Sequence, residues 1–135
     1  MHAVDRLKIA ERLSIARPAN LPPLQICLQV NVSGEGSKSG LRPGEVLALA
    51  QAASRLPGIR LRGLMAIPEP TTHTMVQRAS FLKLRELKDD LVRRGIALDT
   101  LSMGMSDDLE AAIAEGATHV RVGRAIFGER LPNTD

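Results

Sequence analysis

Two short glycine-containing segments combine residue types that can hold a phosphate group. In the first, 102–108 (SMGMSDD), Ser106 and the backbone N–H groups after it could donate hydrogen bonds to an anion. In the second, 120–128 (VRVGRAIFG), a glycine directly after a predicted strand lets the backbone approach an anion closely. Helix capping explains the first segment as well, because Ser106 is a good N-cap and Asp107 and Asp108 suit the first turn of a helix. Both interpretations of this segment are kept.

A third loop, 33–39 (SGEGSKS), lies between a predicted strand and a predicted helix, which is the context of a phosphate-binding P-loop. The P-loop pattern requires a glycine directly before Lys-Ser/Thr and another glycine five residues earlier. Here Ser37 separates Gly36 from Lys38, and Asn31 occupies the earlier position. The pattern therefore fails, and the segment is either an exposed loop or a loop that faces a ligand.

Other combinations of reactive residues do not form a recognisable site in the sequence. His2, His73 and His119 show no metal-ligand spacing with one another or with Cys27, which we expect to be a small buried residue of a strand. No G-x-S-x-G nucleophile elbow occurs. The adjacent acids at 107–108 point in different directions on a helix, which disfavours a paired general acid and base.

The elements that must position these residues alternate between strand and helix patterns. Strands are predicted at 24–32, 59–67, 98–103 and 118–122, and helices at 4–17, 43–56, 74–94 and 106–115. The longest helix carries Phe81, Leu84, Leu87 and Leu91 on one side, with Gly95 as its C-cap. Gly116 is the predicted cap after the last helix. Such alternation predicts a parallel α/β sheet, in which the two phosphate-type segments follow neighbouring strands.

Four strands and about four helices amount to half of a (β/α)8 barrel, which takes roughly 250 residues. The sequence therefore predicts either a small open α/β sheet or part of a TIM-type barrel. Because the chain contains no linker and no low-complexity segment, residues 1–135 are predicted to form a single domain.

Composition excludes several classes of function. The 18 Lys and Arg residues are interleaved with 15 Asp and Glu residues, and two Phe with no Trp or Tyr supply no stacking platform, which disfavours nucleic-acid binding. No apolar run reaches the roughly 18 residues that span a bilayer. A single cysteine cannot form an internal disulfide. We therefore predict a cytoplasmic protein without a membrane segment.

Five segments of the chain match one known family in the same order. They are HAVDR at 2–6, VN at 30–31 with SKSG at 37–40, RGLMAIP at 62–68, LSMGMSDD at 101–108, and VRVG with AIFG at 120–128. The chain thereby resembles the pyridoxal phosphate homeostasis proteins, which are related to the N-terminal barrel of alanine racemase. The resemblance extends from residue 2 to about residue 130, and the last two segments are highly specific.

The resemblance implies a barrel of the alanine racemase N-terminal type, with pyridoxal 5'-phosphate (PLP) at the carboxyl ends of its strands. It also implies a carrier or regulator of the cofactor without catalytic turnover. The residues to which it gives a place in the cofactor site are Ser106, Gly123, Arg124, Arg121, Met103 and Met65.

These residues receive different roles from the resemblance. Ser106, Gly123 and Arg124 take the family's phosphate-holding positions, and Arg121 is placed near the site. Met65 and Met103, at the ends of strands, are expected to line its wall. Position 124 commonly carries a small hydroxyl residue in the family, so Arg124 is a departure that either adds charge to the phosphate site or points to solvent.

The family's Schiff-base lysine lies on an early strand, ahead of the segment that matches residues 2–6. We therefore expect this chain to be the C-terminal portion of a longer barrel, without the first strands and without that lysine, for which Lys38 is no substitute. The expected remainder is a weak phosphate-binding half-site. Half a parallel barrel also has two unpaired strand edges, so we expect self-association.

Two alternative functions are carried forward. The first is a PLP-dependent racemase-like or decarboxylase-like enzyme. A racemase needs a second acid/base residue on the opposite face of the cofactor, and this sequence contains no tyrosine to supply it. The second is a small α/β module for a phosphosugar or a nucleotide, which rests only on the phosphate-type loops and the barrel analogy.

Overall fold

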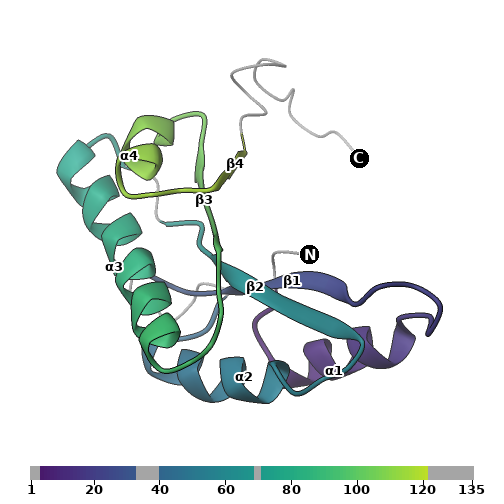
Figure 1. Ribbon diagram of the computed structural model, residues 1–135. Coiled ribbons are helices and arrows are strands. Elements are labelled where there is room, and N and C mark those ends of the chain that lie inside the picture. The colour runs from purple at the N-terminus through teal and green to yellow at the C-terminus, as the bar shows by residue number, and fades with distance from the viewer. Residues whose placement is uncertain (1–3, 33–39, 69–70, 122–135) are drawn as a thin grey trace.

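The computed structural model describes residues 4–32, 40–68 and 71–121. Within them, helices and strands alternate along the chain (Figure 1). In chain order the elements are α1 (Leu7–Ala16), β1 (Leu24–Gln29), the 3₁₀ turn η1 (Pro43–Glu45), α2 (Val46–Ala53), β2 (Ile59–Met65), α3 (Thr74–Arg93), β3 (Thr100–Met105), α4 (Leu109–Ala114) and β4 (His119–Arg121).

The described strands form one parallel sheet in the order β1-β2-β3-β4. Each strand pairs with the next one along the chain, and the helices form the crossovers between them. This arrangement confirms the predicted α/β class with four parallel strands alternating with helices. Because all the strands run in the same direction, their carboxyl ends share one edge of the sheet.

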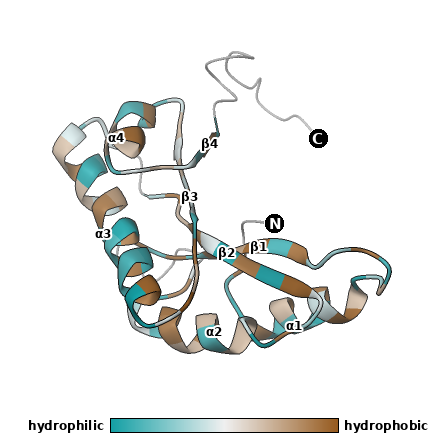
Figure 2. Cartoon of the chain, in the orientation of Figure 1, coloured by the Kyte–Doolittle hydropathy of each residue, from teal (hydrophilic) through white to brown (hydrophobic). Residues whose placement is uncertain are grey.

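One face of the sheet packs against the helices. Figure 2 shows hydrophobic and hydrophilic residues in alternating bands along β2, where Ile59 and Leu61 are buried and Arg60 is exposed. This period of two sends apolar side chains to one face and polar side chains to the other. A single core joins strand residues such as Ile26 to helix residues such as Phe81. The opposite face of the sheet is therefore the more polar one.

The long helix α3 agrees closely with its prediction. Phe81, Leu84 and Leu91 are buried on one side of it. At its end, Gly95 has a φ of +94°, its N–H donates to the carbonyl oxygen of Val92, and the N–H of Ile96 donates to that of Leu91. These two hydrogen bonds make a Schellman motif, so the predicted C-cap is confirmed. Gly116, with a φ of +95°, likewise follows α4.

The start of the chain differs from its prediction, because Val4 is extended and the first helix begins only at Leu7. The N–H of Val4 donates to the carbonyl oxygen of Cys27 at 3.4 Å, and the N–H of Gln29 donates to that of Val4 at 2.7 Å. Val4 therefore forms a parallel bridge with Leu28 on the outer side of β1. The predicted helix at 4–17 was too long, and the outer edge of β1 is partly paired rather than free.

The predicted helix at 106–115 was also too long. Residues 106–108 form a turn, α4 begins at Leu109, and its N-cap is Asp108 rather than Ser106. The physical reason is that the Asp108 carboxylate accepts a hydrogen bond from the N–H of Met105 at 2.7 Å, which closes the turn before the helix begins.

The other boundaries differ by a few residues, as element ends commonly do. The strands predicted at 24–32 and 59–67 end at Gln29 and Met65, the one predicted at 98–103 is shifted to Thr100–Met105, and the helix predicted at 43–56 divides into η1 and α2. The last predicted strand, 118–122, appears as His119–Arg121, and its final residue lies outside the described residues. None of the helices in the described part of the chain is long and apolar enough to cross a membrane.

Candidate functional site

The carboxyl edge of the sheet brings together several of the residues predicted for the site. Met65 and Arg121 are the last residues of β2 and β4, and Met105, which was not predicted for the site, is the last residue of β3. Met105 lies opposite Arg121 in the pairing of β3 with β4, and the half-buried Ser106 directly follows Met105. Gly123 and Arg124 lie outside the described residues, so their phosphate-holding role stays a prediction.

The guanidinium of Arg121 is a positively charged group at this edge. Its Nη2 donates a hydrogen bond to the carbonyl oxygen of Ala66 at 3.4 Å. Its Nε is buried and has no hydrogen-bond partner among the described residues. Burial holds the pKa of Arg121 below its usual value, while the negative charge of Asp108 acts in the opposite direction. A buried donor without a partner is costly, so this atom is suited to an acceptor of a bound ligand.

The two methionines predicted as wall residues occupy different surroundings. Met103 is completely buried and belongs to the core that the helices cover. Met65 is only 2% exposed, but it does not belong to that core. Its neighbours in the sequence, Leu64 and Ala66, do belong to it. The pairing of β1 with β2 shifts between Ile26 and Cys27, so the alternation along β2 reverses after Leu61 and Met65 faces the side of the sheet away from the helices. A packing role is sufficient for Met103, and Met65 is the better placed of the two for a ligand.

The end of β3 is shaped by Gly104. Its φ is +103°, and a Cβ added there would lie 2.6 Å from the Cβ of Ala112 and 3.3 Å from Cγ1 of Val120. Only glycine meets both demands without strain. Gly104 therefore lets α4 and β4 approach the strand immediately before the turn that carries Ser106.

A buried carboxylate holds the helix behind this turn. Glu115, at the C-cap of α4, accepts a hydrogen bond from Nε of Arg78 at 2.8 Å and pairs with Nη1 of Arg85 at 3.5 Å. Its side chain is 7% exposed, whereas both arginines are about half exposed. Both arginines come from α3, so this cluster fastens α4 to α3. The sequence carried no signal for it, because the partners are 30 or more residues apart.

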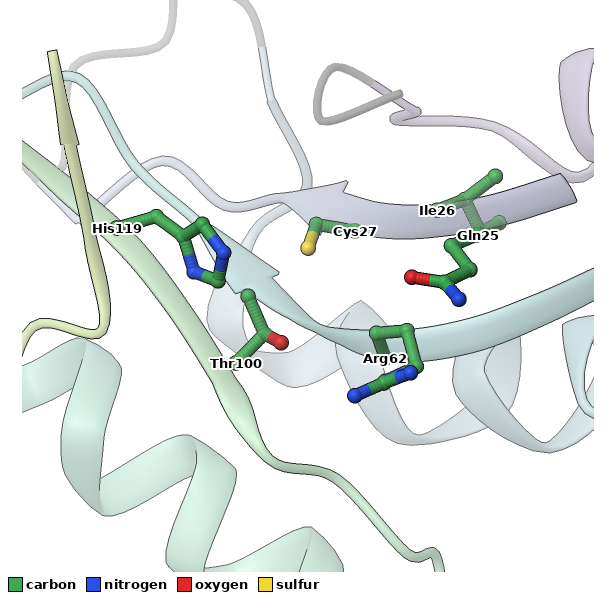
Figure 3. Close-up of a pocket in the computed structure, with 6 residues that line it drawn as sticks. All are labelled: Gln25, Ile26, Cys27, Arg62, Thr100 and His119. Carbon is green, nitrogen blue, oxygen red and sulfur yellow. The ribbon is translucent and has the colours of Figure 1, made fainter.

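A cavity of about 100 Å³ lies on the polar face of the sheet (Figure 3). The residues that line it come from all four strands: Gln25, Ile26, Cys27, Arg62, Thr100 and His119. Cavities that enclose a cofactor-sized ligand measure roughly 300–1,000 Å³, so this one is too small to hold PLP. It is lined by residues of the strands' first and middle positions, away from the carboxyl edge.

Two features of this cavity are electrostatic. Arg62 donates hydrogen bonds to both carboxylate oxygens of Asp99, and the hydroxyl of Thr100 donates another. These hydrogen bonds, chiefly those from Arg62, lower the pKa of Asp99 to about 2. Burial raises the pKa of the Cys27 thiol to about 11. A thiol with that pKa is a poor nucleophile at neutral pH. Cys27 is thus the small buried strand residue that the sequence predicted.

Comparison with known proteins decides the family. The model of the alanine racemase N-terminal domain matches residues 1–131. The chain belongs to the alanine racemase N-terminal domain family. Its four parallel strands are part of that family's barrel, and an alanine racemase of Clostridium difficile, 14% identical, shares the fold with a TM-score of 0.77 over all of this chain and 37% of its own.

Several curated members of the family are much more similar to this chain in sequence. It is 66% identical over 130 residues to the pyridoxal phosphate homeostasis protein of Pseudomonas aeruginosa and 51% identical over 129 residues to that of Escherichia coli. Each match covers 96% of this chain and 55% of the relative. The resemblance to this group is confirmed, and the chain spans about half the length of the curated relatives it matches.

A solved structure in this group contains the cofactor. PipY of Synechococcus elongatus with PLP bound is 34% identical, with a TM-score of 0.75, over 90% of this chain and 57% of its own. A protein of unknown function from Bifidobacterium adolescentis is 42% identical, with a TM-score of 0.86, over 93% of this chain and 51% of its own.

The residues present at the carboxyl edge fit such a cofactor. PLP offers a phosphate, a phenolic oxygen and a ring nitrogen, all of which accept hydrogen bonds or carry negative charge. The buried Nε of Arg121 is a donor in need of an acceptor, and the hydroxyl of Ser106 lies in the turn beside the residue that pairs with Arg121. Both of these polar residues lie at the carboxyl edge of the sheet.

Proposed function

We propose that this chain supplies one side of a PLP site in a protein that carries or regulates the cofactor without catalytic turnover. The observation that carries the proposal is the buried Nε of Arg121, which has no hydrogen-bond partner among the described residues at the sheet edge where the strands end. The similarity to pyridoxal phosphate homeostasis proteins and to a PLP-bound relative supports it. A cytoplasmic location stays a prediction.

In this proposal each described residue has a physical role. Arg121 donates to an acceptor of the cofactor, Ser106 donates to its phosphate, and Met65 excludes water from one side. PLP itself, when bound, supplies a reactive aldehyde on an electron-withdrawing ring. Gly123 and Arg124 complete the phosphate contacts. The sequence contains no tyrosine that could act as a racemase base, which favours a carrier over an enzyme.

We further infer that the lysine that attaches PLP in the family is not among the residues of this chain. Binding to the chain alone is then non-covalent and weaker than in a complete barrel. The sheet order leaves β4 as the last strand of the described sheet, and we propose that a second copy pairs with it. Light scattering coupled to gel filtration tests this: a dimer that dissociates on dilution supports the pairing, and a monomer at all concentrations contradicts it.

An absorbance titration with PLP tests the function, with inorganic phosphate as the competitor. The proposal expects saturable binding that phosphate weakens and that Ser106→Ala reduces, with no PLP retained after borohydride reduction and denaturation. A lysine fixed to PLP by borohydride, located by mass spectrometry, would contradict the inference about the lysine, and Lys38 would be examined first. Absence of any saturable binding would contradict the proposed PLP site in this chain.

A further inference from the structure

Asp108 is bonded twice to the residue at the start of its own turn. Its N–H donates to the carbonyl oxygen of Met105 at 3.2 Å, and its carboxylate Oδ1 accepts from the N–H of Met105 at 2.7 Å. A carboxylate that accepts from a backbone N–H forms a strong, charge-assisted hydrogen bond. The turn at 105–108 is therefore closed by two reciprocal hydrogen bonds between its end residues.

Helix capping does not account for this carboxylate. Asp108 is the N-cap of α4 by position, yet its side chain makes no capping hydrogen bond to the helix. The carboxylate instead reaches back to the last residue of β3. A residue that served only to begin the helix would bond forward, to the N–H two or three residues later. Its backbone carbonyl already receives the helical hydrogen bond from Ala112.

The turn that Asp108 closes carries Ser106, which directly follows the residue that pairs with Arg121. Ser106 lies between the two bonded ends of the turn, and Met105 pairs with Arg121 across β3 and β4. The charge of Asp108 also acts on the guanidinium of Arg121. A movement of this turn would therefore displace the serine hydroxyl relative to the arginine. The hydrogen bond from the Met105 N–H to the Asp108 carboxylate joins the two ends of this turn.

We propose that Asp108 is a positioning residue of the cofactor site, which sets the hydroxyl of Ser106 for a phosphate group by holding the turn at 105–108 closed. The inference rests on the proposed function. It predicts that loss of the Asp108 acceptor weakens the binding of the phosphate part of the ligand more than the binding of its ring. A residue needed only for general stability would weaken both to the same degree.

The test compares three variants of the full chain, using PLP and pyridoxal, which lacks the phosphate, as probes. Asp108→Ala removes the acceptor, Asp108→Asn retains an oxygen at the same position, and Glu110→Ala removes an exposed carboxylate of α4 as the matched control. Hydrogen exchange at the Met105 amide reports the hydrogen bond directly. We expect Asp108→Ala to speed that exchange and to weaken PLP by about tenfold, with pyridoxal changed by less than about threefold.

The same proposal expects Asp108→Asn, which keeps an acceptor oxygen but loses the charge, to lie between the wild-type protein and Asp108→Ala in both measurements, and Glu110→Ala to be indistinguishable from the wild-type protein. If Asp108→Ala does not fold, Asp108→Glu retains the charge but shifts the acceptor, and it should show the same selective loss of PLP. Equal weakening of PLP and pyridoxal, or an unchanged Met105 exchange, overturns the inference. If the wild-type chain binds no PLP, the proposed function fails on its own, and the Met105 exchange still decides whether Asp108 fastens the turn.

Discussion

Arg121, the last residue of β4, donates a hydrogen bond from Nη2 to the carbonyl oxygen of Ala66, which directly follows β2. β3 lies between these two strands, so the arginine side chain extends across the end of β3. The contact joins residues 55 positions apart in the sequence. It satisfies one nitrogen of the guanidinium, whereas Nε is buried and has no hydrogen-bond partner among the described residues.

Replacement of Arg121 by glutamine is expected to weaken PLP binding. A hydrogen bond to a charged group contributes about 1.5–3 kcal/mol, so the Kd should rise by at least tenfold. The measurement is an absorbance or fluorescence titration with PLP, accompanied by a urea unfolding curve. Arg60→Gln is the matched control, because Arg60 is an exposed arginine of β2 in the same sheet.

The control separates a local effect from a general loss of positive charge. If Arg60→Gln weakens PLP as much as Arg121→Gln does, the attraction is long-range and the assignment of Arg121 to the site is wrong. An unfolding midpoint that falls only in Arg121→Gln would instead indicate that its hydrogen bond to Ala66 supports the edge of the sheet.

Much of the fold was predictable because it depends on local patterns. The stripe that contains Phe81 and Leu84, followed by Gly95, determines α3 and its Schellman end within one continuous segment. Val4 shows where such reasoning fails. Its spacing from Leu7 suits a helix, but hydrogen bonds to β1, more than 20 residues away, hold it extended. Pairing with a distant strand is not visible in local periodicity.

The candidate site was predictable to a smaller extent. The resemblance selected Ser106 and Arg121, and the order of the strands placed both at one edge of the sheet. The sequence did not distinguish Met103, which is packed in the core, from Met65, which faces the other side, because both are methionines near strand ends. It also gave Asp108 a capping role, whereas the carboxylate bonds to Met105. Side-chain direction depends on the strand register, which a composition pattern does not specify.

Gly104→Ala is expected to destabilise the chain by about 1–3 kcal/mol, because a methyl group there meets Ala112 at 2.6 Å and the backbone has a positive φ. The free energy of unfolding in urea measures the effect. Gly44→Ala is the control, since a Cβ at Gly44 has nothing within 4 Å, and we expect a change within about 0.5 kcal/mol. Equal stability of the two variants would show that α4 can move away from β3 at little cost.

Glu115→Gln is expected to lower the free energy of unfolding by about 1–2 kcal/mol, because it removes the charge from a buried carboxylate that two arginines of α3 contact. Asp90→Asn is a matched control: Asp90 also contacts two arginines, Arg93 and Arg94, but on the exposed side of α3. Exposed ion pairs contribute little, so its unfolding midpoint should not change. A Glu115→Gln variant as stable as the wild-type chain would show that the cluster does not fasten α4.

The ion pair between Asp99 and Arg62 predicts a specific dependence of stability on pH. The hydrogen bond from Arg62, aided by that from Thr100, lowers the pKa of Asp99 to about 2, below the value near 3.9 of an unfolded chain. The stabilisation is therefore fully present above about pH 4 and is lost as the pH falls toward 2, because only the unfolded state takes up a proton in that window. At low salt, Asp99→Asn should make the urea unfolding midpoint less dependent on pH between 4 and 2. Asp89→Asn, at an exposed position of α3, should leave the dependence of the midpoint on pH as it is in the wild-type chain. An Asp99→Asn chain that keeps the full wild-type slope would show that other carboxylates account for the loss of stability in acid.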